Sequence, residues 1–232
     1  MVKELPRSST AAAALRWPLG IGLTAWRYMW RTTPMHRHEA AGKSIDPPAV
    51  PQHLRDAAQL DQDGVGPLYH RRYGVSISNS RLSASEVMGR VQSNPNVVAP
   101  TEFARFHKLN EETSVMLEGD EYLVHMPGPW NGPVRVVEVT PCSFRFVTLR
   151  THLEAGQIEF RATEENGLLV FEIESWARSG DRLAALLHDT LRMAKEVQLH
   201  MWTSFLEKVI VMSGGTREGL LSIETRRMEP DG

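Results

Sequence analysis

The 232-residue sequence has a single cysteine, no long basic run and no apolar segment long enough to cross a membrane. Cys142 cannot form a disulfide within the chain, which suits a reducing compartment, so we predict a cytoplasmic protein. A membrane-spanning helix needs about 20 apolar residues. The longest uncharged segment near the amino terminus lies between Arg16 and Arg27 and is too short.

The sequence also has little excess charge of either sign. It holds 26 Lys and Arg against 28 Asp and Glu residues, a net charge of −2. Binding to a nucleic-acid backbone needs a concentrated positive surface. The pairs Arg71–Arg72 and Arg226–Arg227 stand alone, and we predict that they are solvated. We therefore predict no nucleic-acid partner, and nothing in the sequence indicates an oligomeric state.

Common signatures of catalysis are absent as well. The sequence contains no G-x-S-x-G, Walker A, H-E-x-x-H or paired C-x-x-C motif. Gly20–Ala25 fits G-x-G-x-x-A, but it follows an Ala-rich stretch instead of the strand that a dinucleotide site requires. His36 and His38 lack a third ligand at metal-binding spacing. We predict no metal and no cofactor.

The first 67 residues differ in character from the rest and are predicted to be a helical extension with a Pro/Gly-rich linker. Apolar residues recur every three or four positions within residues 15–31, with Arg27 and Arg31 beside them. This stripe either packs on the main domain or contacts a membrane surface or a partner protein. Residues 36–67 are predicted to be loop-rich, with a helical turn near Gln52–Gln59.

Residues 68–232 are predicted to form an α+β domain. Ser83 and Glu86 form a capping box that begins a short helix. A helix of about 30 residues is expected from Asp181 to the glycines at 214 and 215, with apolar residues at helical spacing. Period-two and β-branched runs predict strands near 69–78, 102–109, 114–126, 133–139, 143–151, 156–164, 168–177 and 219–227. Three prolines and two glycines at 127–133 predict a reversal without regular pairing.

The strongest hairpin signal is Asn166–Gly167. A two-residue loop there places Arg161 opposite Glu172 and Glu159 opposite Glu174. Apolar and charged residues then separate onto opposite faces, which supports this register. Facing carboxylates are unfavourable unless they are bridged or protonated. The sequence leaves open a solvated face laced by Arg161 or an acid–base or metal site.

Three segments resemble one family. They are MPGPWNGPVRVVEVTPCSFRFVTLRTHLEAGQIEF at 126–160, FEIESWARSGDRLAALL at 171–187 and KEVQLHMWTSF at 195–205. These residues are similar to DUF1990, a family of domains of unknown function, within the SRPBCC superfamily of START, polyketide-cyclase and birch-allergen-like proteins. The resemblance covers about 68–212. It implies a helix-grip fold, in which a curved antiparallel sheet of about seven strands wraps the long C-terminal helix. It supplies no catalytic residues.

A helix-grip domain predicts a binding site between sheet and helix for a small hydrophobic molecule or lipid, lined by apolar residues. The candidate ligand-binding residues are Tyr122, Phe144, Phe146, Phe160, Phe171 and Trp202. One alternative is a cyclase, dehydratase or hydrolase that uses positioned acids and bases. Its candidate catalytic residues are His125, His152, Glu154 and Glu159. The other alternative is an adaptor that acts through the amino-terminal stripe.

Overall fold

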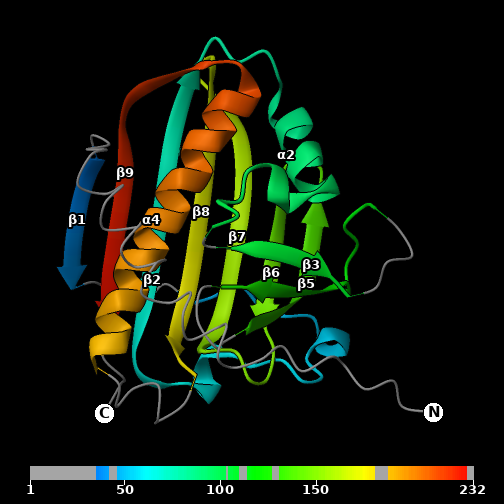
Figure 1. The fold of residues 1–232 in the computed structure, drawn as a ribbon, viewed down its shortest axis with the longest axis vertical. Helices are drawn as coiled ribbons and strands as arrows, with labels where there is room; N and C mark the ends of the chain where they lie inside the picture. The colour runs from blue at the N-terminus through cyan, green and yellow to red at the C-terminus, as the bar shows by residue number, and fades with distance from the viewer. Residues whose placement is uncertain are drawn as a thin grey trace.

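The computed structural model describes residues 35–41, 46–102, 104–109, 114–126, 131–180 and 188–228, with the backbone alone for 35–41 and 188–197. These residues form one nine-stranded sheet in the order β1-β9-β2-β8-β7-β6-β5-β4-β3. The strands are β1 (Met35–Ala41), β2 (Val65–Ser78), β3 (Arg105–Lys108), β4 (Glu121–His125), β5 (Asn131–Thr140), β6 (Ser143–Thr148), β7 (Glu154–Glu165), β8 (Leu168–Ser179) and β9 (Thr216–Met228). The strands at the β3 end run across those at the β2 end, so the sheet curves (Figure 1).

Two α-helices accompany the sheet in the described part of the chain, α2 (Ala84–Ser93) and α4 (His188–Ser213). The predicted capping box is confirmed, because the Ser83 side chain accepts from the Glu86 amide and Glu86 accepts from the Ser83 amide. Short 3₁₀ turns lie at η1 (Gln52–Leu54), η2 (Asp61–Asp63) and η3 (Pro95–Val97). The helical turn expected near residues 52–59 is therefore present.

The predicted hairpin is also confirmed. Asn166 and Gly167 have φ of 51° and 79°, the left-handed pair that a tight two-residue turn requires. Arg161 pairs with Glu172, and Glu159 pairs with Glu174. Because successive strand residues point to opposite faces, this register sends Phe160, Phe171 and their apolar neighbours to one side of the sheet.

Long helix α4 lies across the sheet on that apolar side, in front of β2 and β8 in Figure 1. We call this side the concave face and the opposite side the outer face. Trp202, Phe205, Leu206 and Val209 of α4 are buried in the same core as Tyr73, Phe160, Phe171 and Ile173 of the sheet. The helix ends where predicted, because Gly214 takes φ of +68° and leaves the helix in a left-handed conformation. Asp181, its expected start, lies outside the described residues.

Several predictions of local structure were wrong. The sheet has nine strands instead of about seven, and β1 pairs with β9 in parallel, so the sheet is not wholly antiparallel. Residues 35–41 form this edge strand although the sequence predicted a loop-rich segment there. Strand β5 begins at Asn131, so Pro133 pairs with Leu123 inside the expected reversal. No helix in the described ranges is long and apolar enough to cross a membrane.

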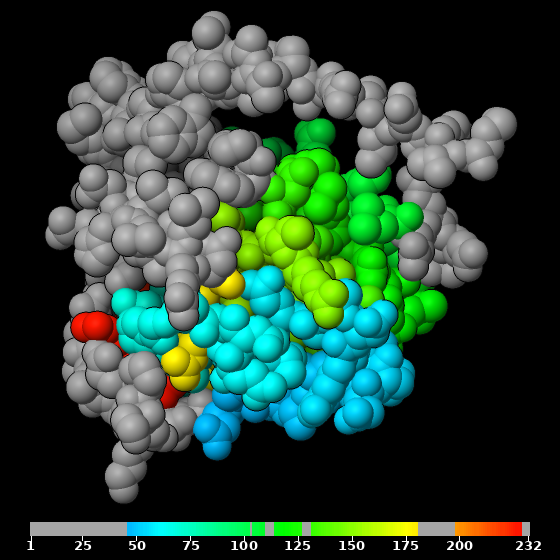
Figure 2. Space-filling view, turned by 90° about the horizontal axis from the view of Figure 1, so that it is seen from below, coloured from blue at the N-terminus to red at the C-terminus, as the bar shows by residue number. Residues whose placement is uncertain are grey.

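The segment 46–64 packs on the outer face. Val50 and Leu54 form a small apolar cluster with Val137 and Val147 of the sheet. Gln59 donates its amide to the Thr148 carbonyl at 2.7 Å. Figure 2 shows this segment (blue to cyan) against the green part of the chain. The segment thereby shields the middle of the outer face from solvent.

Candidate functional site

The concave face changes character along its strands. Tyr73, Ile173 and Phe160 stand in one cross-strand row and are 0–3% exposed. The next row holds Arg71, Ser175 and Ile158, and the row after it holds Tyr69, Ala177 and Gly156. Large apolar side chains are thus replaced by small and polar ones. Ile158 and Ser175 are only partly buried. We call this half of the concave face the polar end.

Gly156 is a position of the polar end that no larger residue can occupy. Its φ is +154°, and an added Cβ would lie 1.9 Å from the Trp176 carbonyl oxygen of the paired strand. Only glycine fits this close approach between β7 and β8. The backbone itself therefore keeps the sheet bare at this point of the concave face.

Three polar side chains meet at the polar end. Arg71 of β2 lies with its Nη1 atom 3.7 Å from Oε1 of Glu154 on β7. Gln198 of α4 donates from Nε2 to Oε2 of Glu154 at 2.8 Å. The Arg71 guanidinium also stands over the Tyr69 ring, 4.8 Å from its centroid. Sheet and helix are thus joined through Glu154, beneath which the small residues lie.

His152 lies beside this group. Its Nδ1 lies 2.9 Å from the Glu154 backbone nitrogen and 3.0 Å from the Glu154 backbone oxygen. Nε2 faces Gly132 so closely that a Cβ there would be 2.8 Å away. Burial lowers the pKa of His152, although the Glu154 carboxylate acts against that shift. The neutral imidazole is therefore favoured near pH 7.

The six aromatic residues predicted to line a ligand site do come together. Phe144 and Phe160 stack with ring centroids 4.7 Å apart, and Phe160 contacts Trp202 at 5.6 Å. All six side chains are 0–8% exposed. The name ring cluster is used for these six residues together with Phe205: Tyr122, Phe144, Phe146, Phe160, Phe171, Trp202 and Phe205. Burial, followed by the nearby Asp120 charge, raises the pKa of Tyr122 to about 12. These rings fill the middle of the concave face by packing on one another.

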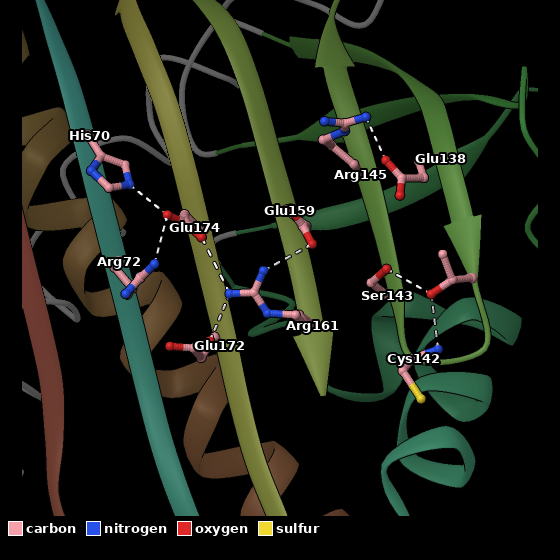
Figure 3. A network of polar contacts seen from close by, with 11 residues as sticks. His70, Arg72, Glu138, Cys142, Ser143, Arg145, Glu159, Arg161, Glu172 and Glu174 are labelled. Atoms are coloured by element: carbon pink, nitrogen blue, oxygen red, sulfur yellow. Dashed lines mark hydrogen bonds and ion pairs between the residues drawn. The ribbon is translucent and has the colours of Figure 1, made fainter. Parts of the chain in front are cut away.

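The four candidate catalytic residues do not all lie together. His152 and Glu154 lie together at the polar end. Glu159 projects from the outer face, where Figure 3 shows it with Arg161 and Glu174. His125 is exposed on β4 and bonds Asn131 Oδ1 through Nδ1 at 3.0 Å. A single site therefore cannot contain all four.

The outer face carries a chain of ion pairs along β2, β8 and β7 (Figure 3). Glu174, 5% exposed, bonds His70 Nε2 at 2.7 Å and accepts from Arg72 at 3.1 Å. Arg161 lies 3.3 Å from Glu159 and 2.8 Å from Glu172, and is 3.5 Å from Glu174. The expected bridging by Arg161 is present, although Glu174 is buried instead of solvated.

The paired carboxylates differ in their electrostatics. Burial raises the pKa of Glu159, and the nearby Arg161 and Arg145 offset only part of that effect. Burial acts in the same direction on Glu174, but bonds from His70 and Arg72 outweigh it and leave its pKa lowered. The ionised form is thus disfavoured at Glu159 and favoured at Glu174. This arrangement fits a stabilising network of ion pairs better than a reaction centre.

A shallow groove runs between α2 and the end of α4, away from the polar end. It is lined by Glu86, Gly89, Arg90, Ser93, Asn94, Val97 and Met212, none of which is a candidate residue. No group of three or more metal-binding side chains occurs among residues the structure describes. Residues 15–31 lie outside those residues, so membrane or partner contact stays a prediction.

Sequence reasoning missed Arg71, Ser175 and Gln198. Arg71 was predicted to be solvated, but it is 6% exposed on the concave face. The signal was present in the alternation of β2, because Arg71 shares its parity with Tyr73, Val75 and Ile77. A charged residue among apolar residues on one face of a strand points to a buried ionic site. Gln198 is identified only by its contact with Glu154 across the helix–sheet interface.

A single curved sheet that clasps one long C-terminal helix defines a helix-grip protein. Residues 100–207 match the family model described as Domain of unknown function (DUF1990). The matched region contains the three segments whose sequence resembles that family. No curated protein matches the chain.

Several solved structures resemble the chain. A conserved protein from Geobacillus kaustophilus is 11% identical with a TM-score of 0.44, covering 65% of this chain and 99% of its own. The di-domain ARO/CYC StfQ of the steffimycin biosynthetic pathway is 11% identical with a TM-score of 0.48, and the match covers 66% of this chain and 52% of StfQ. Norcoclaurine synthase from Thalictrum flavum is 6% identical with a TM-score of 0.42, and the match covers 74% of this chain and 96% of the synthase. Likeness at this level defines no function.

Proposed function

We propose that this protein binds a small molecule with an apolar body at the polar end of the concave face, between β2, β7, β8 and α4. One observation carries the proposal: the face changes within two residues from the packed ring cluster to Ser175, Ala177 and Gly156. Small residues place little side-chain volume on this part of the sheet, where we propose that the ligand lies. Ligand sites of this kind combine apolar walls with a few polar anchors.

The walls and anchors are both on hand. Ile158 is partly buried against the edge of the ring cluster. Glu154 keeps 30% of its side chain exposed, although Arg71 and Gln198 both approach it. Apolar surface left partly open beside the core gains free energy when a ligand covers it, about 25 cal/mol per Å². The ring cluster would thus form the closed inner wall of the site.

The test uses N-phenyl-1-naphthylamine, an uncharged apolar probe that fluoresces when it leaves water. The full chain should bind it with an apparent Kd in the micromolar range, a value typical of apolar burial without ionic contacts. Ser175→Phe fills the polar end and should abolish binding. Thr163→Phe makes the same kind of change on the outer face and should leave binding unchanged. Thermal denaturation of each variant verifies that it folds.

Two results would contradict the proposal. One is an absence of probe binding by wild-type protein. The other is equal binding by wild type and a folded Ser175→Phe variant, because the probe would then sit elsewhere.

A second candidate is an acid–base enzyme acting at the same end of the sheet. The observation in its favour is that His152, neutral through burial, lies next to the Glu154 carboxylate. Compounds extracted from the purified protein would be incubated with wild type and with Glu154→Gln, and their masses compared. A reaction predicts a change in mass with wild type alone. Unchanged masses in both samples would leave binding without catalysis.

A further inference from the structure

Arg71 is the unusual residue of the polar end. Its side chain is only 8% exposed, and a buried guanidinium normally has its donors satisfied by acceptors. Its nearest carboxylate oxygen, on Glu154, is 3.7 Å away, beyond hydrogen-bond distance. The guanidinium donates no hydrogen bond to any residue within the described ranges. The Arg71 guanidinium is therefore a nearly buried charge on the concave face that has an ion pair with Glu154 but donates no hydrogen bond to the described residues.

The described neighbours of Arg71 accept no hydrogen bond from its guanidinium. Ser175 and Thr225 are its cross-strand neighbours on the concave face. Tyr69 offers the face of its ring, which attracts a cation without accepting a hydrogen bond in the guanidinium plane. Glu154 is already held by Gln198 through its other oxygen. Among the described residues, the planar fork of Arg71 thus has no hydrogen-bond acceptor.

From this geometry we infer that Arg71 binds the anionic group of an amphipathic ligand, whose apolar body lies on Ile158 and the edge of the ring cluster. The inference rests on the proposed function and specifies its ligand class. Carboxylate and phosphate both match the two parallel donors of a guanidinium. An ion pair in a water-poor site is stronger than one at the surface. The ligand is therefore an acid with a hydrocarbon tail or ring system.

The experiment compares three ligands with the same twelve-carbon chain, dodecanoate, dodecyl phosphate and dodecan-1-ol, as competitors for bound N-phenyl-1-naphthylamine. Wild-type protein should bind at least one of the two anions about tenfold or more tightly than the alcohol. Dodecanoate and dodecyl phosphate separate a carboxylate ligand from a phosphate ligand. Both would use the same arginine.

Variants then assign the preference to Arg71. Arg71→Met should remove the preference for anions while retaining dodecan-1-ol, whereas Arg71→Lys should keep part of it because the charge remains without the fork. Arg226→Met removes the same charge from the outer face, where Arg226 is 3.7 Å from Glu224, and should change nothing. Circular dichroism checks that each variant folds.

The outcomes separate the two proposals. If the anions and the alcohol displace the probe from wild-type protein equally well, the inference about Arg71 is wrong. Binding of an apolar molecule would still stand. The inference is equally wrong if folded Arg71→Met keeps the full preference for anions. If no ligand competes and the probe does not bind, the proposed function itself fails.

Discussion

At the scale of the residue, Glu159 and Glu174 face each other across β7 and β8 but are held differently. Glu174 lies among His70, Arg72 and Arg161, whereas Glu159 contacts Arg161 alone at 3.3 Å. At pH 7, Glu174→Gln should lower the free energy of unfolding by about 1–3 kcal/mol, because it removes the buried carboxylate that accepts from Arg72 and bonds His70. Glu159→Gln should cost nothing or stabilise by up to about 1 kcal/mol, because it removes a desolvated charge. Urea denaturation measures both.

The pH dependence of the same two variants has opposite signs. The lowered pKa of Glu174 means that its stabilising effect is present above the ordinary value of 4.5 and is lost as pH falls through the folded-state pKa. The difference between wild type and Glu174→Gln should therefore shrink below about pH 4.5. The raised pKa of Glu159 means that wild type should gain on Glu159→Gln as pH falls from 7 towards 4.5. Matching pH curves for both variants would contradict these assignments.

The residues show what a sequence can and cannot reveal about a site. Pairing of Glu159 with Glu174 followed from the two-residue turn, because one turn fixes every partner along two strands. Burial of Glu174 did not follow, since it depends on the bonds from His70 and Arg72 of β2. Arg71 was misjudged because two adjacent arginines look like a surface pair. In a strand, adjacent residues lie on opposite faces, and one face here is the core.

At the scale of the element, local signals located the pieces that depend on near neighbours. The capping box, the glycine end of α4 and the Asn166–Gly167 turn each satisfy backbone groups within a few residues, so their sequence motifs suffice. Strand β1 has no such signal. It forms by pairing with β9, which lies almost two hundred positions later, and an edge strand needs one partner only. Long-range pairing of this kind is not encoded in a local pattern.

Two glycines that differ only in conformation test the turn. Gly167 has φ of +79° with no atom within 4 Å of an added Cβ, so Gly167→Ala should cost about 1 kcal/mol from backbone strain alone. Gly89 lies inside α2 and is equally open, so Gly89→Ala should stabilise by about 0.5–1 kcal/mol. Thermal unfolding of both variants provides the comparison. Shifts of the same sign would show that the left-handed turn is not what requires Gly167.

At the scale of the whole molecule, the order of strands, short helix and long helix was enough to predict the clasp of sheet and helix. An apolar sheet face and an apolar helix stripe each need a partner, and in this chain they are each other's best partner. How the space between them is filled could not be predicted in this way. It depends on which rows pack rings against α4 and which carry serine, alanine and glycine, and those rows exist only once the strands are in register.

The ring cluster packs the sheet against α4. Truncating its rings should therefore destabilise the protein and should not enlarge a ligand site. Phe160 is 1% exposed and lies 4.7 Å from Phe144, 5.6 Å from Trp202 and 5.4 Å from Phe205, measured between ring centroids. Phe160→Ala should therefore lower the free energy of unfolding by about 3–5 kcal/mol, the usual cost of truncating a buried aromatic residue. Val211 of α4 is 80% exposed, so Val211→Ala should change the free energy of unfolding by less than about 0.5 kcal/mol. If Phe160→Ala instead folds with near wild-type stability and binds the probe more tightly, the rings line the ligand site and the polar end is only its entrance.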